Sequence, residues 1–217
     1  MRGRVHRQVG HLRIDVGGST ARDVLIPLLP DFVARYPDIR LDLGVSDRAV
    51  DLIGDNVDAV IRGGPLDNSS LVARAIGHAT MLTCATPAYL KQFGVPAYPE
   101  ELKNGHRLVA YVSTRNGRAM PFRFAHEGVH SEIKVEHRIG VNESNAHLAA
   151  CLAGLGVVQT FAYAARSALQ EGALVEILRK WRPPPYPFHV VYPHNRHLTQ
   201  RLRVFIDCQQ LPCDLDY

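Results

Sequence analysis

The first third of the chain alternates between strand-like and helix-like patterns. Strand-like runs occupy Leu12–Val16, Ile39–Leu43 and Asp58–Arg62, and the last is continuously apolar in its middle, as in a strand buried on both faces. Between the first two runs, apolar residues recur at helical spacing from Asp23 to Tyr36. Strands separated by helices favour crossover connections, so this order predicts an α/β fold with a parallel sheet and helices on its faces.

Turn residues and prolines mark where the predicted helices and strands begin and end. Ser19 or Thr20 is placed to cap the first helix, and Pro30 is expected to kink that helix or remove a hydrogen bond. The proline-rich stretch Val95–Pro99 is the best candidate boundary between two halves. Beyond the first three strands we expect strands at 71–76, 81–85, 107–111, 122–125, 135–141, 157–160, 174–178 and 188–192, and helices at 50–54, 86–90, 144–152, 161–170 and 198–210.

The net charge of +4 comes from one end of the chain. The first 13 residues hold four arginines and no acid, so the remainder balances bases against acids. A balanced surface is not a basic platform for nucleic acid, and the basic end is interpreted as a solvated tail. No apolar run reaches the about 18 residues that a membrane span needs, and no secretory signal is recognised.

Cysteine and histidine spacing gives no metal or catalytic signature. Cys84 and Cys151 lie in apolar runs and are interpreted as small buried hydrophobes, and with Cys208 and Cys213 they form no CxxC pair. No HxxxH pair falls within a predicted helix, because His126 and His130 lie in a glycine-containing polar stretch that indicates a loop or hairpin, so we expect no metal site and no cofactor. GxSxG, Walker and strand-linked GxGxxG patterns are missing, so no catalytic residue is assigned and an enzyme is not predicted.

Several short motifs, taken in order, resemble one family. The central ones are Ser46-Asp47-Arg48, Asp58–Gly64 and Ser69–Arg74. Two further pieces precede these motifs, Leu25–Phe32 and Arg35–Pro37. Others come after them at matching spacing: Ala85–Leu90, Val141–Glu143, Ala153–Val157, Gly172–Val175 and Arg201–Asp207. In this order, they resemble the effector-binding domain of LysR-type bacterial transcriptional regulators over nearly the whole chain from Leu12 onward.

The resemblance implies a fold and a domain arrangement. The family has two Rossmann-like α/β lobes with a ligand cleft between them, like the type-2 periplasmic binding proteins. We expect residues 12–86 and 188–210 to form lobe I and residues 87–187 to form lobe II, with tails at 1–11 and 211–217. The crossings between lobes would lie near Cys84–Pro87 and Pro187–His189.

The resemblance also implies a function. A small effector, expected to carry a carboxylate, binds between the lobes and acts on a winged helix-turn-helix that reads operator DNA. That DNA-binding part is absent from these 217 residues, so they are not expected to bind DNA specifically. We expect a cytoplasmic homo-oligomer, a dimer or at full length a tetramer, with no membrane partner. The alternatives are a solute-binding protein of a transport system, which would need a secretion signal, and an enzyme such as a transferase on the same fold.

Candidate effector contacts begin with two helix starts. Ser19 and Thr20 in lobe I, and Asn142 and Glu143 in lobe II, stand where free N–H groups and a partial positive charge suit a carboxylate. Ordinary helix capping explains the same residues without a ligand. Glu143 disfavours a second anion, which leaves room for a ligand that carries an amine or a hydroxyl.

Strand ends supply the other candidate contacts. Arg62 could clamp a carboxylate where Gly63 lets a ligand approach, or it could pair structurally with Asp58 or Asp47. Ser46 either reaches the ligand or, with Asp47, caps the next short helix, and capping is favoured. In lobe II, a strand ends at Thr160 and Phe161, and the Phe161 ring is either a wall for the ligand or part of the core.

The resemblance further implies a subunit contact between the first helix and the helix after residue 143. We expect this contact to use the apolar side of each helix, namely Leu25, Leu29, Phe32, His147, Leu148 and Cys151.

Overall fold

A computed structural model of the protein describes residues 9–48, 50–64, 71–134, 136–193 and 199–208. Residues 65–70, which include the start of the third central motif, lie outside the described residues, as do Cys213 and most of both expected tails. The described chain divides into two compact units. Unit 1 takes residues 9–46, 50–64, 71–77, 187–193 and 199–208, and unit 2 takes residues 47–48, 78–134 and 136–186.

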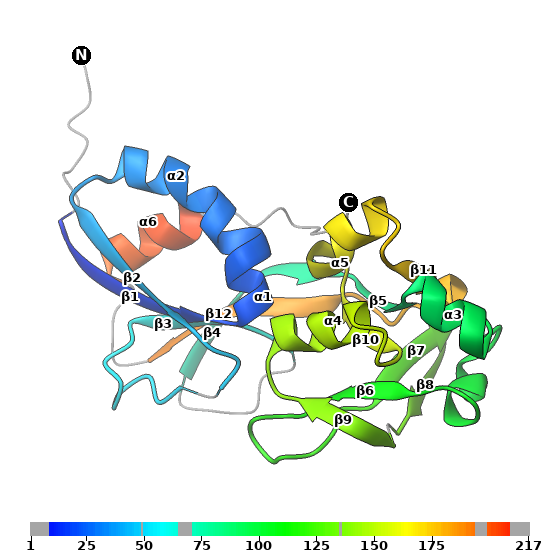
Figure 1. The fold of residues 1–217 in the computed structure, drawn as a ribbon. Coiled ribbons are helices and arrows are strands. Elements are labelled where there is room, and N and C mark those ends of the chain that lie inside the picture. The colour runs from blue at the N-terminus through cyan, green and yellow to red at the C-terminus, as the bar shows by residue number, and fades with distance from the viewer. Residues whose placement is uncertain (1–8, 49, 65–70, 135, 194–198, 209–217) are drawn as a thin grey trace. The chain divides into compact units, whose positions relative to one another are not determined.

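Unit 1 is built on a five-stranded sheet with the order β2-β1-β3-β12-β4 (Figure 1). Strand β1 pairs in parallel with both β2 and β3, and β12 runs antiparallel to β3. The parallel arrangement predicted for the first three strands is confirmed. The strands are β1 (Gly10–Val16), β2 (Ile39–Val45), β3 (Ala59–Gly63), β4 (Leu71–Ala79) and β12 (Tyr186–Pro193).

The helices of unit 1 bury one apolar side each. One continuous helical run contains α1 (Gly18–Thr20), a π-helical turn (Ala21–Leu25) and α2 (Ile26–Arg35), and the second helix is α6 (Gln200–Cys208). Phe32 of α2 meets Phe205 of α6 edge to face, with ring centroids 5.3 Å apart. Pro30 lies inside α2, where it removes one backbone hydrogen bond without ending the helix. The short helix predicted at 50–54 is a turn instead, because the Asp51 side chain accepts from the backbone N–H of Ile53 at 3.1 Å.

Unit 2 is a mixed unit with three small sheets (Figure 1). Strand β5 is the centre of a three-stranded antiparallel sheet, β6 and β9 pair in parallel, and β7 and β8 form a hairpin. The strands are β5 (Met81–Ala85), β6 (Leu108–Tyr111), β7 (Phe122–His126), β8 (Val129–Ile133), β9 (His137–Val141), β10 (Val158–Phe161) and β11 (Val175–Ile177). The helices are α3 (Pro87–Phe93), α4 (Ser144–Leu152) and α5 (Ala162–Gln170), with 3₁₀ turns at Pro99–Lys103 and Arg179–Trp181.

Two features of unit 2 differ from the sequence expectation. We expect Met81–Ala85 in lobe I, whereas this strand pairs with β10 and β11 inside unit 2. Strand β8 is not among the predicted strands, because its residues are mostly polar and exposed. The turn that folds it back onto β7 has left-handed backbone at Glu127 and Gly128, with φ of 48° and 79°.

Buried polar and sulfur groups tie the elements of unit 2 together. The Gln159 amide on β10 donates to the Arg123 carbonyl on β7 at 2.8 Å and accepts from the Arg123 N–H at 2.9 Å. These two hydrogen bonds give the backbone of Arg123 the partners that a neighbouring strand would otherwise supply. They hold β7 beside β10. Cys151 of α4 lies with its Sγ 3.6 Å from the carbonyl oxygen of Cys84 on β5, and both cysteines are fully buried, as predicted.

Candidate functional site

The helical run of unit 1 begins earlier than predicted. Its N-cap is Gly17, whose backbone is extended, and no side chain caps the first turn. Ser19 and Thr20 lie inside that turn, with only 3% and 5% of their surfaces exposed. The prediction that one of them caps the helix is therefore wrong, because helical backbone begins one residue before Ser19. Thr20 borders a small apolar cavity together with Leu25 and Ile61.

Arg62 forms an ion pair inside unit 1. Its Nη2 group donates to Asp15 Oδ1, and its Nη1 group donates to the Ile61 carbonyl at 2.9 Å. The Asp15 side chain is 8% exposed and the Arg62 side chain 24%. The structural partner is thus Asp15 rather than Asp58, whose carboxylate accepts from the backbone N–H of Arg13 at 2.9 Å. A ligand carboxylate at this guanidinium would compete with Asp15.

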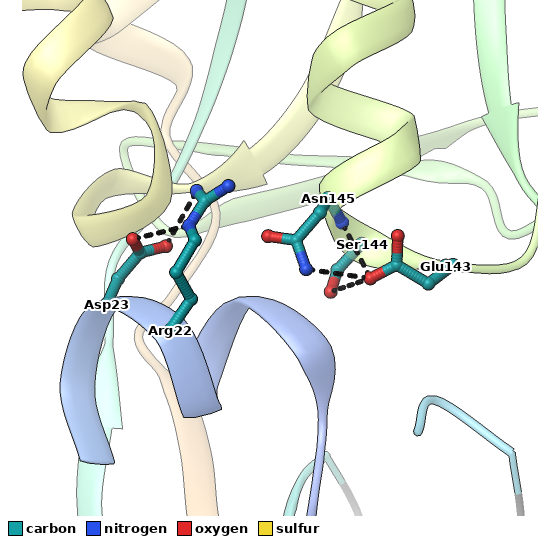
Figure 2. A network of polar contacts seen from close by, with 5 residues as sticks. All are labelled: Arg22, Asp23, Glu143, Ser144 and Asn145. Atoms are coloured by element: carbon teal, nitrogen blue, oxygen red, sulfur yellow. Dashed lines mark hydrogen bonds and ion pairs between the residues drawn. The ribbon is translucent and has the colours of Figure 1, made fainter. Parts of the chain in front are cut away.

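The other polar candidates of unit 1 lie at strand ends and on the helix surface. Ser46 follows β2 and its backbone N–H donates to the Val16 carbonyl at 3.0 Å, while Gly63 is the exposed last residue of β3. Arg22, on the exposed side of the helical run, donates two hydrogen bonds to its neighbour Asp23 at 2.8 and 2.9 Å (Figure 2).

In unit 2, the start of α4 is capped by Glu143. Its Oε1 accepts from the backbone N–H of Asn145 at 2.9 Å, and its Oε2 accepts from that of Ala146 at 2.8 Å. The side-chain amide of Asn145 also donates to Glu143 Oε1, at 2.9 Å (Figure 2). Asn142, just before the cap, is exposed. Glu143 therefore occupies the N–H groups at which we expected an effector carboxylate.

A second carboxylate reaches the same helix start from a distant part of the chain. Asp47 Oδ2 accepts from the backbone N–H of Ser144 at 2.5 Å and from the Tyr111 hydroxyl at 3.2 Å, and the Thr114 hydroxyl donates to the Asp47 carbonyl at 2.9 Å. The prediction that Asp47 caps the following short helix is therefore wrong. No local pattern signals its real position, because Asp47 and Ser144 lie 97 residues apart in sequence.

Aromatic rings lie in the same unit, beyond the end of β10. The half-buried Phe161 ring stacks on Tyr163 at 5.2 Å and tilts toward Tyr186 at 5.6 Å, while Thr160 is buried. Burial raises the pKa of Tyr186, and burial together with the carboxylates of Asp47 and Glu143 raises that of Tyr111. Both phenols therefore stay protonated at neutral pH.

The residues expected at a subunit contact are mostly internal. Helical spacing identifies an apolar stripe without showing whether it faces the core or a partner, and here it faces the core. Leu29 is half-buried, and the prediction is wrong for five residues that are buried within the chain: Leu25, Phe32, His147, Leu148 and Cys151.

In the ranges that the structure describes, no group of three or more His, Cys, Asp or Glu side chains could hold a metal ion. No helix in those ranges is long and apolar enough to cross a bilayer.

The buried imidazole of His147 gives a testable pH dependence. It is 3% exposed, its Nε2 lies 2.9 Å from the Val109 carbonyl, and burial lowers its pKa although that hydrogen bond opposes the shift. The folded chain then binds this proton less readily than the unfolded chain. The neutral imidazole of His147 therefore stabilises the folded chain fully at pH values above its ordinary pKa of 6.5. This stabilisation is lost as the pH falls below that value.

We expect the urea midpoint to fall between about pH 7 and pH 5, and His147→Gln to make that fall shallower. Denaturant titrations of both chains across this range measure the difference. Other titrating groups, including His106 with its pKa lowered by burial, affect both chains equally. Parallel midpoint curves for the two chains would contradict the assignment to His147.

Comparison with known proteins places this architecture in a class. The LysR substrate binding domain model matches residues 6–210. The chain is 38% identical over 197 residues to the uncharacterized HTH-type transcriptional regulator YhjC of Escherichia coli, covering 91% of this chain and 66% of that protein. An HTH-type transcriptional repressor of Pseudomonas aeruginosa is 36% identical over 209 residues, covering 95% of this chain and 65% of that protein. The chain thus spans slightly less than two thirds of these relatives.

Solved structures agree with the family match. The regulatory domain of CrgA from Neisseria meningitidis has a TM-score of 0.79 at 30% identity, over 94% of this chain and 98% of that domain. Full-length AphB of Vibrio cholerae, a virulence activator, has a TM-score of 0.77 at 29% identity, over 93% of this chain and 68% of that protein. The fold is that of the regulatory domains of transcription factors. The chain belongs to the LysR substrate binding domain family of LysR-type transcriptional regulators.

Proposed function

We propose that this chain is the effector-sensing part of a cytoplasmic transcription regulator and does not itself catalyse a reaction. A small molecule binds to it, and the resulting change alters operator binding by a helix-turn-helix domain outside these 217 residues. The family match over residues 6–210 carries the proposal. Curated relatives named as transcriptional regulators support this reading over a solute-binding protein for transport.

The lobes and effector contacts expected from sequence remain part of this proposal. We propose lobes near residues 12–86 with 188–210 and near 87–187, apart from the placement of β5 described above. The exposed or half-buried candidates are the more accessible contacts, and buried Ser19, Thr20 and Thr160 would require local opening. The accessible set contains Ser46, Arg62, Gly63, Asn142, Glu143 and Phe161.

The direct test uses the full-length regulator and its own promoter DNA. Compounds from a metabolite library that raise the melting temperature of the 217-residue chain are added to a DNA-binding titration. We expect at least one to change operator affinity by about fivefold or more, the lower range of allosteric coupling. Stabilising compounds that leave DNA affinity and reporter transcription unchanged would contradict effector sensing and favour a binding protein of another kind.

Self-association is the second part of the proposal, and the exposed side of α2 suggests where to test it. Ile26 and Val33, seven residues apart on this helix, are 48% and 56% exposed. An apolar pair on one side of a helix is a candidate for contact with a second copy.

We expect Val33→Glu to weaken self-association of the chain about tenfold or more, because it places a charge in that contact. Sedimentation equilibrium over a range of protein concentrations measures the change. Ala34→Glu, exposed on the adjacent side of the same helix, is the matched control and should leave association unchanged. Equal behaviour of the two variants would exclude this side of α2 as the contact.

A further inference from the structure

The start of α4 in unit 2 is already occupied by negative charge. Asp47 accepts from the backbone N–H of Ser144, and Glu143 accepts from those of Asn145 and Ala146. These N–H groups are the ones that would hold an anion at a helix start. An incoming carboxylate would meet two carboxylates and would find those donors already engaged.

One acceptor beside these carboxylates lacks a donor. Asn145 Oδ1 is buried and has no hydrogen-bond partner in the described part of the chain. The orientation of this amide is set by its other end, because Asn145 Nδ2 donates to Glu143 Oε1 at 2.9 Å and a flipped amide would oppose two oxygens. A buried acceptor without a donor destabilises a protein. A donor supplied from outside the chain would satisfy it.

Aromatic groups of unit 2 complete the surroundings. The Tyr111 hydroxyl donates to Asp47 at 3.2 Å, and the nearby Glu143 carboxylate and Tyr186 phenol both help to raise the pKa of Tyr111, so these groups lie near one another. Tyr186 in turn lies against the ring of Phe161, with centroids 5.6 Å apart. The faces of neutral aromatic rings attract cations.

Two arginines of unit 2 bear on this charge balance. Arg48 follows Asp47 in the chain and is exposed, so solvent screens it. Arg123, whose charge acts on Tyr186, forms an ion pair with Glu132 at 3.0 Å. Two carboxylates, an amide oxygen and aromatic rings are thus brought together beside the start of α4.

We propose that the effector presents a protonated amine or guanidine group to Glu143, Asp47 and Asn145 at the start of α4, next to an apolar or aromatic body. The effector then binds here as a hydrogen-bond donor rather than as a carboxylate. This ligand class presupposes the effector-sensing function proposed above and names the chemistry of its ligand.

The test compares amines and acids that share a carbon skeleton, such as tyramine with para-hydroxyphenylacetate and benzylamine with benzoate. Each compound is titrated calorimetrically into the 217-residue chain at neutral pH and at two salt concentrations. We expect at least one amine to bind about tenfold or more tightly than its acid counterpart, with an affinity that falls as salt rises.

Two variants localise the binding. Glu143→Gln keeps an oxygen that can cap α4 but removes the charge, and Asn145→Ala removes the unpartnered oxygen. We expect each to weaken amine binding about fivefold or more, while Glu132→Gln, an exposed carboxylate of the same unit, serves as the unchanged control. Melting curves of the free variants show whether they remain folded.

The possible outcomes are distinct. Tighter binding of the acids, no binding by any amine, or equal affinity of Glu143→Gln and Glu132→Gln would each overturn the amine class. Acid binding that also changes operator affinity would overturn the ligand class and leave effector sensing intact. Effector sensing itself fails only in the operator titration described under the proposed function.

Discussion

Asp15→Ala is expected to lower the free energy of unfolding by about 3 kcal/mol, because it leaves the guanidinium of Arg62 largely buried without its carboxylate. Asp15 lies on β1 and Arg62 on the neighbouring β3, so the pair joins two strands of the unit 1 sheet. Urea unfolding followed by circular dichroism at neutral pH measures the change, and an unaltered slope would show that the folded state is otherwise intact.

Two further variants serve as controls for the effect of Asp15→Ala on stability. Asp42→Ala removes a half-buried carboxylate on the adjacent β2 whose ion pair with His11 lies near the surface, so it should lower the urea midpoint far less than Asp15→Ala does. The double variant Asp15→Ala with Arg62→Leu should recover most of the lost stability, since no unpaired charge remains. If Asp15→Ala instead behaves like Asp42→Ala, the pair contributes little to folding. The guanidinium of Arg62 would then be easier for an anionic ligand to engage.

Gly156→Ala is expected to cost about 2–3 kcal/mol, because the new methyl group collides with the backbone. A Cβ at this position would lie 2.3 Å from the carbonyl oxygen of Arg107 and 2.9 Å from its carbon. Side-chain rotation cannot relieve such a contact. The same carbonyl accepts from the N–H of Val157 at 2.8 Å, so relief would break a hydrogen bond beside the bridge that joins Leu108 to Val157.

Thermal and urea unfolding of Gly156→Ala measure this cost against Leu155→Ala. Leu155 is the preceding residue and is 41% exposed, so its truncation should cost well under 1 kcal/mol. A melting temperature for Gly156→Ala within a degree or two of that control would show that β6 and β10 can separate freely. The close packing inferred at this junction would then be wrong.

Periodicity predicted the parts of the fold that follow from local sequence. The first three strands and the helix from Ser144 to Leu152 were recognisable because their apolar spacing and turn residues agree with the final structure. Strand β8 was not, because a polar hairpin strand lacks an apolar alternation. The antiparallel place of β5 in unit 2 depends on partners more than seventy residues away, which periodicity does not register.

The candidate site was predictable only where its chemistry is local. Glu143 was recognised as part of a helix start, and its capping role follows from the residues beside it. The pairing of Arg62 with Asp15 required knowledge of strand neighbours, and the bond from Ser144 to Asp47 required the tertiary fold. Side chains on one helix, such as Phe32 and Val33, cannot be assigned to core or surface before the packing partner is known.

The contact between Cys84 and Cys151 determines how thiol reagents can be used on this domain. Hydrogen bonding to Cys151 and burial raise the pKa of Cys84 well above its ordinary value, and neither side chain is exposed. A reagent that attacks thiolates must therefore wait until unit 2 opens. The rate at which a thiol reagent labels these two cysteines would therefore report the rate of local unfolding of unit 2. For the same reason, neither cysteine is a good candidate for sensing an oxidant directly.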